Sequence, residues 1–284
     1  MIKTFFLTAF VAVSFGCFGQ NQAPVYLWPG QVPGETENKH EPVETPDHSR
    51  DVIRLTDVTN PAFIVFKPAR ENNTSAGVIV CPGGGYGILA YNLEGTEIAE
   101  WLTKQGFTAF VLQYRVPKKQ EGALIDIQRA IRLIRNDSIK YRIKSNRIGV
   151  MGFSAGGSLS ARAATRYGIK SYSPADQADS LSCRPDFAIL IYPAYLDQGA
   201  NRSLTPELIV NQNTPPMFLF ATADDNYGNS ALVIAAALRE AKVPVELHFM
   251  PKGGHGYGLR PGNIAAETWP GLAEKWLKRI LEEK

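Results

Sequence analysis

A strand, a tight turn and a helix start follow one another in the middle of the chain, and this order constrains the fold most. Residues 147–151 form a short apolar run that is typical of a buried strand. Gly152-Phe153-Ser154-Ala155-Gly156 follows directly, and small residues then begin a predicted helix over residues 155–166. A sharp strand-to-helix turn needs very small residues two positions before and after its centre. The segment therefore predicts Ser154 at the tip of such a turn.

The rest of the chain continues this alternation of strands and helices. The patterns predict strands over residues 77–81, 108–113, 187–192, 217–221 and 245–250, and helices over residues 96–105, 123–141, 230–241 and 265–281. Residues 51–58 and 62–67 alternate like exposed strands and are expected to form an early antiparallel pair. This order predicts an α/β-hydrolase fold, with a mostly parallel central sheet and helices on both faces.

The chain is expected to form one folded domain behind a leader and an arm. Its 284 residues suit one large α/β domain and leave little room for a second. Residues 1–19 have a basic start and an apolar run too short to span a bilayer, which is typical of a signal peptide for secretion or periplasmic export. A lipid anchor on Cys17 is the alternative. Residues 20–50 are proline-rich and predict an extended arm across the surface of the catalytic domain, residues 51–284.

Charge and residue spacing exclude several classes of ligand. The net charge is only +3 without a long basic run, so nucleic acid is not an expected partner. No group of His, Cys, Asp and Glu has metal-ligand spacing, and we expect no metal and no cofactor. We also expect no membrane span, and no disulfide between Cys81 and Cys183 because a parallel sheet would hold them at opposite edges. The oligomeric state stays open.

Ser154 is the candidate nucleophile. A serine hydroxyl needs a base, and in this fold the chain order is serine, then an acid, then histidine. Only His248 and His255 follow Ser154. His248 lies inside the alternating strand 245–250, where an ordinary strand side chain is expected, whereas His255 lies in a glycine-rich loop just past it. We therefore predict His255 as the base.

The acid is expected after the strand 217–221, where Asp224 and Asp225 are adjacent. The residues alone do not separate them: one would orient His255, and the other would cap the next helix or bind loop amides. Asp186 and Asp197 flank the preceding strand and are weaker alternatives.

A run of glycines supplies candidate donors for an oxyanion. Pro82-Gly83-Gly84-Gly85-Tyr86 follows the strand 77–81, where this fold keeps such donors, and we predict the amides of Gly84, Gly85 and Ala155. The run lacks the ending of a phosphate loop, so a nucleotide is not expected. Tyr91, Glu94 and Arg115 fall near the same edge, although a helix-start acid and a solvated arginine explain Glu94 and Arg115 equally well.

Several motifs spread over most of the chain carry a family resemblance. They are Leu27-Trp28-Pro29-Gly30, Cys81-Pro82-Gly83-Gly84-Gly85-Tyr86, Gln113-Tyr114-Arg115, residues 126–135, Gly152-Phe153-Ser154-Ala155-Gly156-Gly157, Pro215-Pro216, Asp224-Asp225 and Gly253-Gly254-His255-Gly256. With them the chain resembles bacterial α/β-hydrolase esterases of the acetylxylan esterase-like and feruloyl esterase-like kind. It departs from them at Ser158-Leu159, where relatives often have His-Leu, and in a shorter loop over residues 226–229.

The resemblance implies that the chain hydrolyses short acyl esters, commonly acetyl groups on plant polysaccharides or oligosaccharides such as xylan. It also implies that the acid is Asp225. Rival functions on the same fold are a feruloyl esterase, a lipase and a serine peptidase. A rival of another class is a non-catalytic carbohydrate-binding protein that kept the fold.

Overall fold

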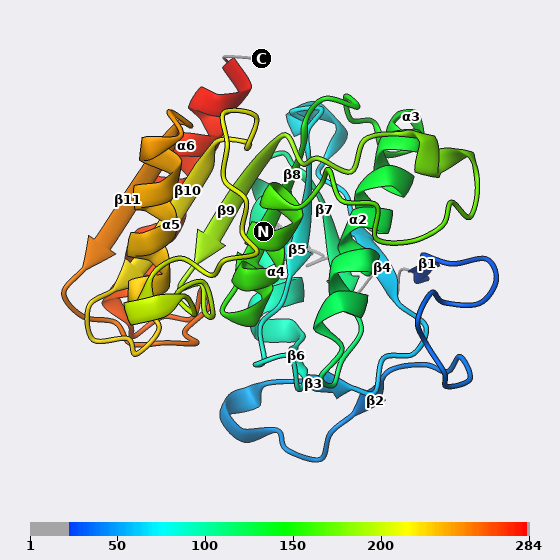
Figure 1. Cartoon of the computed structure of the whole chain (residues 1–284), viewed down its shortest axis with the longest axis horizontal. Helices are drawn as coiled ribbons and strands as arrows, with labels where there is room; N and C mark the ends of the chain where they lie inside the picture. Colours follow the sequence, from blue (N-terminus) through cyan, green and yellow to red (C-terminus); the bar gives the residue numbers. More distant parts are fainter. Residues whose placement is uncertain (1–22, 283–284) are drawn as a thin grey trace, which may run out of the picture.

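An eight-stranded sheet forms the centre of the molecule (Figure 1). The structure is a computed structural model that describes residues 23–282, so the predicted signal peptide lies outside the described residues. Six neighbouring strands run parallel, and two antiparallel strands extend one edge. In spatial order the strands are β1 (Val25–Tyr26), β4 (Ala62–Phe66), β7 (Thr108–Gln113), β5 (Gly77–Cys81), β8 (Ile148–Phe153), β9 (Phe187–Ile191), β10 (Met217–Thr222) and β11 (Val245–Met250).

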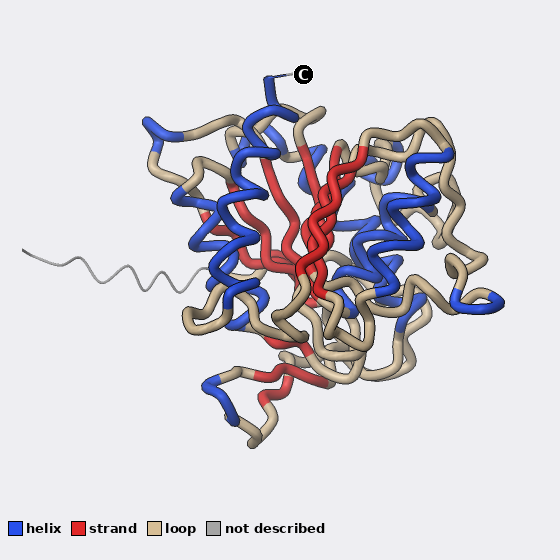
Figure 2. Tube along the Cα trace, turned by 90° about the vertical axis from the view of Figure 1, so that its left-hand side faces the viewer, coloured by secondary structure: helices blue, strands red, loops and turns tan. Residues whose placement is uncertain are grey.

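Helices cover both faces of this sheet, as the α/β-hydrolase prediction requires (Figure 2). One face packs against α2 (Gln120–Asn136), α4 (Ala155–Thr165) and α5 (Asn229–Glu240), and the other against α1 (Glu97–Lys104) and α6 (Ile264–Glu282). No helix within residues 23–282 is long and apolar enough to cross a membrane.

The apolar stripe of α2 shows why this segment is a helix. Leu124, Ile127, Ile131 and Ile134 recur every three or four residues and are all buried against the sheet. The predicted helix over residues 123–141 is in fact two helices, because the chain leaves α2 at Asp137 and continues as the short α3 (Ser138–Tyr141).

A second, three-stranded sheet lies beyond the ends of the main strands toward which the β9 and β11 arrows point (Figure 1). It consists of β2 (Val43–Glu44), β3 (Arg54–Thr56) and β6 (Leu89–Ala90). The predicted early antiparallel pair is therefore wrong: β3 pairs with β2 and β6, whereas β4 pairs with β1 and β7. Alternation of apolar and polar residues predicts that a segment is a strand, but it does not predict which other strand it pairs with.

The arm does more than cross the surface. Its β1 adds an edge strand to the main sheet, and Leu27, Trp28 and Val32 are buried in the core. The indole of Trp28 donates to Asp126 Oδ1 at 3.3 Å, and the Leu27 carbonyl accepts from Arg129 Nε at 3.1 Å. These contacts attach the arm to α2.

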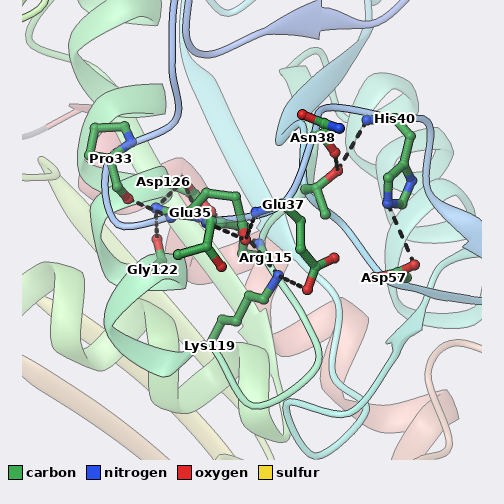
Figure 3. Close-up of polar contacts among 12 residues, drawn as sticks. Pro33, Glu35, Glu37, Asn38, His40, Asp57, Arg115, Lys119, Gly122 and Asp126 are labelled. Carbon is green, nitrogen blue, oxygen red and sulfur yellow. Dashed lines mark hydrogen bonds and ion pairs between the residues drawn. The ribbon is translucent and has the colours of Figure 1, made fainter.

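Arg115 lies beneath the arm and is buried, so the solvated arginine considered from the sequence is not what the structure has. Its Nε lies 2.9 Å from Asp126 Oδ2, and its two terminal nitrogens donate to the carbonyls of Pro33 and Gly122 at 2.6 and 3.0 Å (Figure 3). Because every guanidinium nitrogen is used by protein acceptors, Arg115 is a structural residue that fixes the arm.

Candidate active site

The turn at Ser154 joins β8 to α4 and has the strained backbone that its motif predicts. Ser154 has φ of 52° and ψ of −118°, a conformation that non-glycine residues rarely adopt. A Cβ on Gly152 would lie 2.0 Å from the Gly156 carbonyl oxygen, and a Cβ on Gly156 would lie 2.0 Å from the Cys81 carbonyl oxygen. Only glycine fits at either position, and the tight turn places the Ser154 side chain at the carboxyl end of the sheet.

His255 reaches Ser154 from the loop that follows β11. Its Nε2 lies 2.7 Å from Ser154 Oγ, although 101 residues separate the two in the chain. The other candidate, His248, points its Nε2 at Glu246 Oε1 2.8 Å away within the same strand. The structure thus brings His255, and not His248, to Ser154.

The two adjacent aspartates after β10 face different groups. Asp225 is buried and its Oδ2 lies 2.7 Å from His255 Nδ1. Asp224 is exposed and accepts hydrogen bonds from the amides of Gly253 and Gly254 at 3.2 and 2.9 Å. These bonds, chiefly the one from Gly254, hold the pKa of Asp224 below its ordinary value.

The weaker alternatives for the acid are engaged elsewhere. Asp186 pairs with Arg135 at 3.0 Å, and Asp197 pairs with Arg202 at 2.7 Å. Ser154, His255 and Asp225 therefore form one hydrogen-bonded series, in the geometry that activates a serine.

The glycine loop after β5 lies beside Ser154. The amide of Gly83 is already occupied, because it donates to Glu94 Oε2 at 2.7 Å. The amides of Gly84 and Gly85 have no protein acceptor within residues 23–282. Ala155 is the first residue of α4, where an amide has no acceptor inside its own helix. These three amides therefore have no protein acceptor in the described part of the chain and are available to a ligand atom beside Ser154.

A pocket of about 280 Å³ opens over Ser154. Aromatic side chains form one wall: the Tyr227 ring lies 5.0 Å from the His255 ring and 5.4 Å from the Tyr195 ring, centre to centre. Both tyrosines are partly exposed. The sequence reasoning missed them, although Tyr227 stands only two residues after Asp225 and its place in the acid loop was a usable signal.

Two arginines line another part of the pocket, and both come from the segment around β3. The guanidinium of Arg54 donates to the backbone carbonyls of Asp47, Ser49 and Val52. Arg50 makes one longer bond, from Nη2 to the Gly256 carbonyl at 3.3 Å. Sequence reasoning did not find these residues because the small sheet that carries Arg54, and the turn before it that carries Arg50, were not predicted.

Glu94 lies behind the glycine loop with only 3% of its surface exposed. It lies in the first turn of the π-helical segment η3 (Asn92–Thr96), which leads directly into α1, so it is the helix-start acid considered from the sequence, but it is buried. Its Oε1 accepts from the Tyr192 hydroxyl at 2.8 Å. Burial raises the pKa of this carboxyl above its ordinary value.

One group of possible metal ligands was not foreseen from sequence spacing. Glu37, His40 and Asp57 hold ligand atoms within 4.8 Å of one another, on the arm and on the turn after β3 (Figure 3). His40 lies 3.5 Å from Asp57, and all three side chains are at least partly exposed. Because water solvates these charges, no ion is needed to balance them, and we assign none.

Comparison with known families and sequences gives consistent results. Residues 64–180 match the profile of the BD-FAE family. An acetylxylan esterase of Xylanibacter ruminicola is 30% identical over 233 residues, which are 73% of this chain and 46% of that protein. The chain spans less than half the length of the curated relatives that it matches.

Two solved structures resemble this one over most of its length. An acetyl ester-xyloside bifunctional hydrolase from Caldicellulosiruptor lactoaceticus has a TM-score of 0.74 and 32% identity, covering 91% of this chain and 96% of that one. An α/β-hydrolase enzyme from a Medee basin deep-sea metagenome library has a TM-score of 0.63 and 28% identity, covering 85% of this chain and 98% of that one. The second match confirms the predicted fold class.

Proposed function

Because this chain belongs to the BD-FAE family of α/β-hydrolase esterases, we propose that it removes short acyl groups, chiefly acetyl, from plant polysaccharides or oligosaccharides such as xylan. The observation that carries the proposal is the hydrogen-bonded series from Asp225 through His255 to Ser154, of which His255 and Ser154 line an open pocket.

The proposed reaction has two acyl-transfer steps. His255 Nε2 takes the Ser154 hydroxyl proton while Oγ attacks the ester carbonyl, and Asp225 stabilises the imidazolium through Nδ1. The carbonyl oxygen becomes an oxyanion that accepts from the amides of Gly84, Gly85 and Ala155.

The intermediate then collapses. The C–O bond to the alcohol breaks, His255 gives that alcohol its proton, and an acyl-Ser154 ester remains. Water, deprotonated by His255, attacks this ester and releases the carboxylic acid, which restores the Ser154 hydroxyl. No metal or cofactor has a role in this scheme.

The pocket supports a bulky alcohol as the leaving group. His255 must face the leaving oxygen to protonate it, and Tyr227 packs beside His255 at the pocket wall. A tyrosine ring offers an apolar face and a polar edge, which suits a sugar ring with C–H faces and hydroxyl edges. The names of the acetylxylan esterase and the acetyl ester-xyloside hydrolase point to the same substrate class.

Acetate release from acetylated xylan by wild type and Ser154→Ala tests the proposal. We expect wild-type release and a loss of about 10⁴-fold or more in the variant. Parallel assays with feruloyl, long-chain acyl and peptide substrates test the rival enzymes. Efficient turnover of one of these without acetate release from xylan would refute the acetyl proposal. A fluorophosphonate that fails to label Ser154 would favour the non-catalytic rival.

We also propose that residues 1–19 direct export, because a polysaccharide substrate lies outside the cell. Mass spectrometry of the exported protein is expected to find Gln20 at the amino terminus. A lipid on Cys17 or retention in the cytoplasm would contradict this proposal.

A further inference from the structure

The glycine loop and the histidine loop are joined by a buried hydrogen-bonded path that the proposed reaction does not use. The Gly83 amide donates to Glu94 Oε2 at 2.7 Å, and the Tyr192 hydroxyl donates to Glu94 Oε1 at 2.8 Å. The same hydroxyl accepts from the Gly258 amide at 3.0 Å. Gly83 directly precedes Gly84, one of the proposed oxyanion donors, and Gly258 follows His255 by three residues.

This path lies directly behind the reacting atoms. A Cβ on Gly83 would lie 2.5 Å from Glu94 Oε2 and 2.8 Å from the Ser154 Cβ, so the carboxylate and the serine share one glycine as their neighbour. The Tyr192 ring lies 5.0 Å from the His255 ring, centre to centre. A small displacement of Glu94 or Tyr192 would therefore shift both the glycine loop and the loop that carries His255.

The hydrogen bonds require both carboxylate oxygens as acceptors. A backbone amide can only donate, and the single Tyr192 hydroxyl proton is directed to Glu94 while its oxygen accepts from Gly258. A buried carboxylate is unfavourable unless it is paired with donors, and burial raises its pKa here. A side chain that served packing alone would not need these two acceptor oxygens.

We infer that Glu94 is a positioning residue that, through Tyr192, holds the oxyanion donors and His255 in register with Ser154. The inference rests on the proposed function, because it assigns Glu94 a place in that same reaction. Its role is to fix two loops, and it makes no contact with the reacting atoms.

Glu94→Gln and Tyr192→Phe test this inference. The amide of Gln accepts through one oxygen only, so it cannot accept from both the Gly83 amide and the Tyr192 hydroxyl; if its nitrogen donates to Tyr192 instead, the Tyr192 hydroxyl proton loses its acceptor. Phe keeps the ring beside His255 and removes only the hydroxyl. We measure kcat and KM on p-nitrophenyl acetate and the rate at which a fluorophosphonate labels Ser154. Glu100→Gln, an exposed change on the neighbouring α1, is the matched control.

We expect Glu94→Gln to lower kcat and the labelling rate by about 10- to 100-fold with KM changed less than about threefold. Tyr192→Phe is expected to act in the same direction, and Glu100→Gln to leave both rates at the wild-type value. The double variant should lose no more than the worse single variant, because both changes break one path.

Three results would overturn the inference. They are a wild-type labelling rate in both single variants, losses that multiply in the double variant, or a rise in KM at constant kcat. If Glu94→Gln does not fold, the labelling rate of Tyr192→Phe alone tests the inference, and a wild-type rate would overturn it. Failure of the proposed function looks different, because then the fluorophosphonate does not label Ser154 even in wild type.

Discussion

Asp224 and Asp225 are neighbours in the chain, but their carboxylates hold different parts of one loop. Asp225 contacts the imidazole of His255 at 2.7 Å, whereas Asp224 accepts from the Gly254 amide at 2.9 Å. One carboxylate orients the ring, and the other fixes the backbone that carries it.

This division predicts unequal effects of two matched substitutions. Asp225→Asn is expected to lower kcat by about 10⁴-fold, because an amide at this position favours the wrong tautomer of His255. Asp224→Asn keeps an oxygen acceptor for one loop amide and should lose far less. Steady-state kinetics on a soluble acetyl ester measures both, and a larger loss in Asp224→Asn would reverse the assignment.

Tyr227 is expected to select for the alcohol part of the substrate. Tyr227→Ala should raise KM for acetylated xylo-oligosaccharides by up to about tenfold, because it removes an aromatic face from the pocket wall. The kcat for ethyl acetate reports any displacement of His255, and Tyr227→Phe keeps the ring as the control. If Tyr227→Ala changed the kinetic constants for ethyl acetate as much as those for the xylo-oligosaccharides, this would contradict a role in recognising the alcohol.

The buried Glu94 predicts a pH-dependent difference in stability. Burial raises the pKa of its carboxyl above the ordinary value of 4.5, so the folded state binds this proton more tightly than the unfolded state. The stability that Glu94 contributes is complete below 4.5 and is lost as the pH rises through the raised pKa. Glu94→Gln has no such loss.

Thermal unfolding of wild type and Glu94→Gln between about pH 4 and pH 8 measures this difference. We expect the melting temperature of the variant to rise relative to wild type with increasing pH. The charged and titratable groups that act on Glu94 are the same in both proteins, namely His255, Arg50, Tyr192, Tyr257 and Tyr114. A difference that stays constant across this range would show that the carboxyl does not titrate abnormally.

Loss of Arg115 should destabilise the fold. Arg115→Met leaves Asp126 buried without its counter-ion, and we expect urea unfolding to show a loss of about 3–5 kcal/mol. Adding Asp126→Leu should recover part of this loss. Lys278→Met, which removes an exposed pair with Glu274, is the control, with an expected loss below about 1 kcal/mol. Equal losses in the two single variants would contradict the structural role of Arg115.

Local pattern was enough to predict the strands that carry the site. Strand patterns gave β5, β7 and β11 with their observed ends, and the glycines around Ser154 predicted its turn. Chain order then placed His255 against Ser154, where the structure has it. These features depend on neighbours in the sequence or on the order of elements in a known sheet.

Features that depend on distant partners were not predictable in this way. The residues alone did not separate Asp224 from Asp225, because the choice depends on which way two adjacent side chains turn. Glu94 is 98 residues from Tyr192, and the strand pattern of β3 does not reveal β6 as its partner. Pairing over such separations is set by the assembled fold.

The attachment of the arm has a consequence for the order in which the chain folds. Trp28 meets Asp126 across 98 residues, and the Leu27 carbonyl meets Arg129 across 102. Synthesis proceeds from the amino terminus, so the ribosome makes this arm long before it makes the helix that receives it. The arm is therefore translated first but has no partner at that time, and it can dock only after α2 has been synthesised and has packed against the sheet.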